Sequence, residues 1–160
     1  MARGYLRVML SAYFKTLLLQ QCKSVLASKM AHLHTELSEI SESMSNETKS
    51  SVGDKHETAR ARMQAEQEKL GRQLSGLELQ LKELERISTT EAHVTIGPGS
   101  LVETNKGFFF ISAALGKVIC DGKEVYAISP QSPLAQKMKG LKAGSEFEFN
   151  TIQYKIKGVF

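Results

Sequence analysis

The fold is decided by two stretches, residues 19–44, LQQCKSVLASKMAHLHTELSEISESM, and residues 63–87, MQAEQEKLGRQLSGLELQLKELERI. In each stretch apolar residues recur at steps of three and four, which is the spacing of one helix face. The two patterns mirror each other when paired antiparallel, with facing residue numbers that sum to about 107. The facing pairs are Met44 with Met63, Leu37 with Leu70, Leu33 with Leu74, Met30 with Leu77, and Leu26 with Leu81. This seam predicts an antiparallel coiled-coil hairpin.

The mirror point lies between Gly53 and Asp54, so the hairpin tip is expected near residues 50–58. We expect the first helix over about residues 10–49 and the second from Asp54 to about Ile87. Gly53 is expected to supply the turn, because glycine adopts turn conformations at low cost, and Asp54 is expected to cap the second helix. Two carboxylates, Asp54 and Glu57, are thereby placed at the tip.

After residue 90 the pattern changes to short strands separated by glycine-containing turns. One helix interrupts them, with Ser132 as its N-cap, Pro133 at its first position and Gly140 or Gly144 at its end. The sequence thus predicts an α+β fold, in which a hairpin domain, 1–90, precedes a small sheet-plus-helix domain, 91–160. The expected strands are 100–104, 108–112, 118–120, 125–129, 146–149 and 153–159.

Composition narrows the class of protein. The 160 residues are 41% hydrophobic and 24% charged, as in globular proteins, and the formal net charge is +4. The two cysteines, Cys22 and Cys120, are far apart and are expected to be free thiols of a reducing compartment. Because Lys15 and two glutamines interrupt the most apolar N-terminal stretch, we expect no membrane span and a cytoplasmic protein. Translation could begin at Met1 or Met9.

Two motifs resemble those of the Gre family of bacterial transcript-cleavage factors. Residues 53–59, GDKHETA, resemble the family's tip motif G-D-x-x-E-N-A-E-Y. Residues 128–145, from ISPQSPLA to KGLKAGS, resemble the family's S-P-[IL]-[AG]…G-x-x-x-G-D. The motifs occur in the family's order, and the overall layout covers nearly the whole chain. The resemblance implies an FKBP-like C-terminal domain.

The resemblance also implies a function. Such factors insert the hairpin into the secondary channel of RNA polymerase and stimulate Mg²⁺-dependent cleavage of backtracked RNA at its 3′ end. Asp54 and Glu57 match the family's two tip acids, which help to hold Mg²⁺ in the polymerase active centre. The protein would therefore not be an enzyme itself, would bind no cofactor alone, and would need neither a small-molecule substrate nor a membrane.

Five basic residues near the tip are candidates for contact with RNA phosphates. An ordinary solvated helix face is the alternative interpretation. These residues are Lys55, Arg60, Arg62, Lys69 and Arg72.

Three further alternatives stay open. Asp54 and Glu57 also have the spacing of a capping box, which stabilises a helix start without binding metal. The chain departs from the family motif at Thr58, Arg60 and Ala61. An alternative function is therefore that of a non-catalytic regulator that binds the same polymerase channel. The hairpin could also serve an adaptor unrelated to polymerase.

Overall fold

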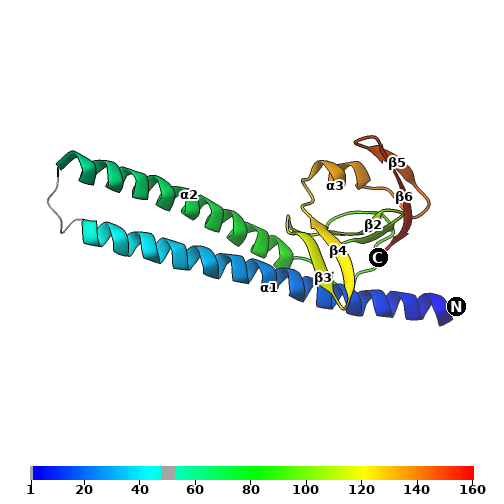
Figure 1. The fold of residues 1–160 in the computed structure, drawn as a ribbon. Helices are drawn as coiled ribbons and strands as arrows, with labels where there is room; N and C mark the ends of the chain where they lie inside the picture. The colour runs from blue at the N-terminus through cyan, green and yellow to red at the C-terminus, as the bar shows by residue number, and fades with distance from the viewer. Residues whose placement is uncertain (1, 48–52) are drawn as a thin grey trace. The chain divides into compact units, whose positions relative to one another are not determined.

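The structure is a computed structural model that describes residues 2–47 and 53–160, with the backbone alone for residues 2–10, 53, 54 and 56. Its packing divides the chain into two compact units (Figure 1). One unit joins Met1–Val25 to Lys82–Phe160, and the other is Leu26–Leu81. The first contains the sheet, and the second is the distal part of the helical hairpin.

The hairpin helices are α1, Ala2–Glu47, and α2, Gly53–Glu85. Helix α1 begins well before residue 10, so the predicted start of this helix is wrong. An apolar seam is not needed to extend a helix that has already formed, because each added residue contributes one hydrogen bond. The described part of α1 ends at Glu47, close to the expected end near residue 49.

The start of α2 also differs from the prediction. Gly53 is already helical, so Asp54 lies in the first turn of the helix and not at its N-cap. Residues 48–52 lie outside the described residues, and the expected turn at Gly53 is wrong because Gly53 is part of the helix. An acidic residue in the first turn interacts favourably with the helix dipole, which is consistent with helix at this position.

The hairpin seam is confirmed within the unit Leu26–Leu81. Leu26, Leu33 and Leu70 are buried, and the other predicted seam residues are at least half-buried. The Gln67 amide donates to the Ser41 hydroxyl across the two helices at 3.5 Å. This contact fits the mirror register. Seam burial decreases towards the tip, where Met44 and Met63 are only half-buried.

Six strands follow in one sheet, in the spatial order β3-β4-β2-β1-β6-β5. All neighbouring pairs are antiparallel except β2 with β4. Each expected strand is present to within two residues at either end. The strands are β1 Leu101–Thr104, β2 Gly107–Ile111, β3 Gly116–Cys120, β4 Lys123–Ile128, β5 Glu146–Phe149 and β6 Ile152–Val159.

The single helix of this domain is α3, Pro133–Met138. As predicted, Pro133 occupies the start of the helix and the Ser132 hydroxyl accepts a hydrogen bond from the Ala135 amide at 3.3 Å. Gly140, with φ of 79°, follows the C-cap, because a side chain is unfavourable in that conformation. Helix α3 packs against β5 and covers one face of the sheet.

Residues on both faces of the sheet are buried. On the α3 side the core includes Phe109, Met138, Tyr154 and Ile156. The Phe147 ring stacks on the Tyr154 ring, with 5.0 Å between the ring centroids. Phe110 and Val125 are fully buried in the same sheet. These facts establish the α+β fold.

The base of α1, meaning its part before Leu26, belongs to the same unit as the sheet. It packs on the sheet domain through Cys22. This side chain is completely buried and hydrogen-bonds Ser112. Burial raises the pKa of the Cys22 thiol to about 12, and burial also raises the pKa of Cys120. Both cysteines are free thiols. No helix within residues 2–47 and 53–160 has a segment long and apolar enough to cross a membrane.

Candidate functional site

The candidate site at the hairpin tip is carried by the first two turns of α2. Asp54 is in the first turn, and its side chain lies outside the described residues. Glu57 follows three residues later, and its side chain is exposed. Residues three apart on a helix lie on the same side of it, so positions 54 and 57 share one side of α2.

The five basic candidates are all exposed, but helix geometry does not place them on one face. Lys55, Arg62 and Lys69 follow one another at steps of seven, so they share a stripe along α2. Arg72 continues this stripe one turn after Lys69, whereas Arg60 falls on the other side of the helix. Lys69 also pairs with Glu66 at 3.8 Å, which reduces the positive charge of the stripe.

The two tip acids, Asp54 and Glu57, carry the type of ligand that Mg²⁺ binds in proteins. Carboxylate oxygens are hard ligands, and Mg²⁺ commonly takes one or two of them and keeps several waters. No group of three or more His, Cys, Asp or Glu side chains that could hold a metal occurs within the described part of the chain.

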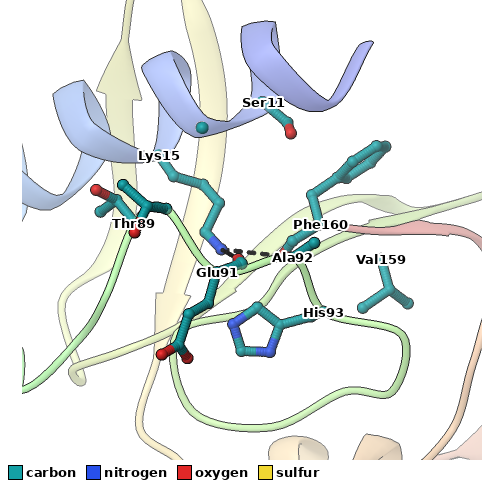
Figure 2. A pocket seen from close by; sticks show the side chains of 10 residues that line it. Ser11, Lys15, Thr89, Glu91, Ala92, His93, Val159 and Phe160 are labelled. Atoms are coloured by element: carbon teal, nitrogen blue, oxygen red, sulfur yellow. Dashed lines mark hydrogen bonds between the residues drawn. The ribbon is translucent and has the colours of Figure 1, made fainter. Parts of the chain in front are cut away.

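A second polar site lies at the base of α1 and was missed by the sequence analysis. Lys15 is 1% exposed, although it is a charged residue. Its amine donates to the main-chain oxygens of Phe160 at 3.2 Å and Glu91 at 3.4 Å (Figure 2). One residue along α1, Thr16 donates to the Thr89 hydroxyl at 2.8 Å.

Lys15 lines a cavity of about 90 Å³ within the sheet-containing unit. The cavity is surrounded by α1, by the segment after α2 and by the end of β6, and Figure 2 shows the amine directed towards the segment that carries Glu91 and His93. Burial lowers the pKa of Lys15 to about 8, although the Glu91 carboxylate partly opposes this shift. Burial, and then the charge of Lys15, lower the pKa of His93.

A signal for Lys15 was present in the sequence. Counting back from Leu19 and Cys22 by four and seven residues leads to Lys15, so the residue occupies a position of the buried helix face. A cation at such a position indicates a buried, hydrogen-bonded group. The pattern could not predict the hydrogen-bond acceptors of Lys15, because Glu91 and Phe160 lie 76 and 145 residues away in the sequence.

We expect stability to depend on pH through Lys15. The folded protein holds this proton less tightly than the unfolded chain, with a pKa of about 8 against 10.5. Stability should therefore rise with pH between these values, since the unfolded state then binds more protons. The Lys15→Met variant should lack this rise, which we expect to reach about 2 kcal/mol after allowance for solvent screening. Urea unfolding of both proteins at several pH values measures the difference.

Because the wild type and Lys15→Met share all other titratable groups, the difference between their stabilities reports on Lys15. Cys22 acts in the opposite direction, because its raised pKa makes the folded state less stable as pH rises above 9.0. That effect is common to both proteins and cancels. Parallel stability curves for the wild type and Lys15→Met would contradict the assignment of a perturbed pKa to Lys15.

No family profile matches the sequence, and no curated protein matches it. Among solved structures, the fold is similar to that of the transcription factor Gfh1, with 17% sequence identity, a TM-score of 0.35, and coverage of 86% of this chain and 92% of that chain.

Proposed function

We propose that this protein binds RNA polymerase, inserts the hairpin tip into the secondary channel and stimulates Mg²⁺-dependent cleavage of backtracked RNA. The proposal rests on one observation above all. The chain places two acidic residues, Asp54 and Glu57, in the first turns of a helix directly after the hairpin connection. The motif resemblance in both domains supports it, as does the order of a helical hairpin followed by a sheet domain.

Hairpin length is compatible with this role. From Leu81 to Glu57 the helix α2 extends by 24 residues, or about 36 Å at 1.5 Å per residue. A two-helix coiled coil is narrow, about 20 Å across with its side chains. A structure of these dimensions is suited to carrying charged groups into a channel that a globular domain could not enter.

The chemical role of the chain is to supply oxygen ligands. Mg²⁺ bound between polymerase and the tip would activate the attacking water or stabilise the leaving oxygen of the phosphodiester. Asp54 and Glu57 would complete the ion's coordination and orient its waters. Lys55, Arg62, Lys69 and Arg72 would lie beside the RNA and neutralise phosphate charge, with Arg60 on the other side of the helix. The cleaving active centre would belong to polymerase, so this protein would not itself be an enzyme.

The direct test is a cleavage assay on a stalled, backtracked polymerase complex with labelled RNA. Addition of the protein with Mg²⁺ is expected to release a short 3′ fragment and to restore extension. The matched controls omit the protein or replace Mg²⁺ with a chelator. Absence of shortening at every protein and Mg²⁺ concentration would contradict the cleavage role.

A non-catalytic regulator of the same channel is the second candidate. The exposed Arg60 and the small Ala61 favour it, because a positive charge and a methyl group stand where the family motif has a carboxylate and an aromatic ring. This candidate predicts competition with an established channel-binding factor without RNA shortening. Failure to bind polymerase at all would exclude both candidates and favour an adaptor with another partner.

A further inference from the structure

We propose that Lys15 is a nucleophilic site that takes small activated acyl groups, such as the acyl group of an acyl phosphate, in the cavity at the base of α1. The amine is held in place by two main-chain oxygens and lies in a cavity of about 90 Å³. That volume is sufficient for a group of a few heavy atoms, such as acetyl. Nothing in the proposed polymerase function uses this site.

The surroundings of the amine favour the neutral, reactive form. Only the unprotonated amine is nucleophilic, and desolvation is a common means of activating lysine. At about pH 7.5, an amine with a pKa of about 8 is about one-quarter unprotonated, against about one in a thousand for an ordinary lysine. The two accepting oxygens hold the side chain in one position, so the amine does not move freely.

The cavity also supplies a proton acceptor and a place for the acyl group. His93 lines it, and its lowered pKa keeps the imidazole neutral at neutral pH. The titratable groups that act on the Lys15 amine are Glu91, whose carboxylate favours the lysine cation, and His93. Ala92, Val159 and Phe160 provide apolar lining that can receive a methyl group (Figure 2).

The reaction balances without a redox partner. The Lys15 nitrogen attacks the acyl carbon, a C–N bond forms, and the bond from that carbon to the phosphate oxygen breaks. Inorganic phosphate leaves, and the nitrogen loses one proton to His93 and then to solvent. The amide product keeps one N–H, so it can satisfy only one of the two main-chain oxygens that the amine satisfies now.

The test measures the acylation rate of each lysine in the folded wild-type protein. Acetyl phosphate is added at about pH 7.5, and peptide mass spectrometry follows the modification over time. Lys15 should react about tenfold faster than the exposed Lys29 and Lys137, because its larger free-amine fraction outweighs its lower basicity and restricted access. Reaction of Lys15 at or below the rates of these two lysines would overturn the proposal.

Two further measurements separate the cavity from the local sequence. In urea the preference for Lys15 should vanish, and a preference that persists there would refute the role of the cavity. The His93→Gln variant should slow acylation at Lys15 several-fold and leave Lys29 unchanged, with His34→Gln, an exposed histidine on the hairpin, as the matched control. Equal rates at Lys15 in His93→Gln and wild type would remove His93 from the reaction.

Discussion

The variant Asp54→Ala/Glu57→Ala is expected to bind polymerase normally and to lose at least about 100-fold of the RNA-cleavage stimulation, because metal-assisted catalysis contributes several kcal/mol to the transition state. Both side chains would act only when the ion and the scissile phosphate are in place. The loss should therefore appear in the cleavage rate at saturating protein and not in the affinity for polymerase. Single-turnover cleavage assays and a binding titration measure the two quantities separately.

Three control variants test whether the acids act through the metal or through helix stability. Asp54→Asn/Glu57→Gln keeps side-chain size and removes only the negative charge, so it should fail as completely as the alanine pair. Asp54→Ser keeps a small polar side chain in the first turn of α2 but has no carboxylate, and it too should be defective. Glu68→Ala removes an exposed acid further along α2 and should leave cleavage unchanged.

The outcome of these controls decides between the two interpretations of the D-x-x-E motif. Full activity in Asp54→Ser would indicate that cleavage does not need the Asp54 carboxylate. Full activity in the double alanine variant would reject the proposed role of the tip. Circular dichroism of each variant confirms that α2 is intact before the kinetic result is interpreted.

The second large effect is expected in the sheet core, where Phe110→Ala should destabilise the domain by about 3–5 kcal/mol. Phe110 is 0% exposed and lies on the inner strand β2. Its register partners are Leu101 on β1 and Ala127 on β4, both buried. Ala127 is too small to fill the space that the ring leaves, so a cavity should remain.

Urea unfolding followed by tyrosine near-UV circular dichroism measures this loss, since Tyr126 and Tyr154 lie in the sheet. The matched control is Ile119→Ala on the edge strand β3, where the side chain is 60% exposed. Its effect should stay within about 0.5 kcal/mol. A change below about 1 kcal/mol for Phe110→Ala would contradict the placement of this ring in the core. The expected loss is a large share of the 5–15 kcal/mol that stabilises a typical domain.

The elements of the fold could be predicted because their signals are local. Steps of three and four identified the hairpin seam, alternation and glycine turns identified the six strands, and the Ser132-Pro133 pair identified the start of α3. Element ends were less certain. The start of α1 at Ala2 and of α2 at Gly53 differ from the predictions, because helix extension and first-turn charges have no sharp sequence boundary.

The candidate tip site was proposed from the sequence, and its two acids and basic residues remain predictions. The structure adds that Glu57 and the five basic residues are exposed, and helix geometry separates Arg60 from the stripe of the other four. The cavity around Lys15 was not predicted. Its parts come from α1, from the segment after α2 and from the end of β6, and only folding brings them together.

The sequence by itself determined the α+β class, the seam of the hairpin and the acidic pair near its tip, because each depends on residues a few positions apart. Tertiary structure alone decided the strand order, with β2 parallel to β4, and the burial of Lys15 against Glu91 and Phe160. Those features depend on contacts between residues far apart in the chain. Periodicity predicts which face of an element is buried, but it does not predict which distant backbone oxygen will accept a hydrogen bond from that face.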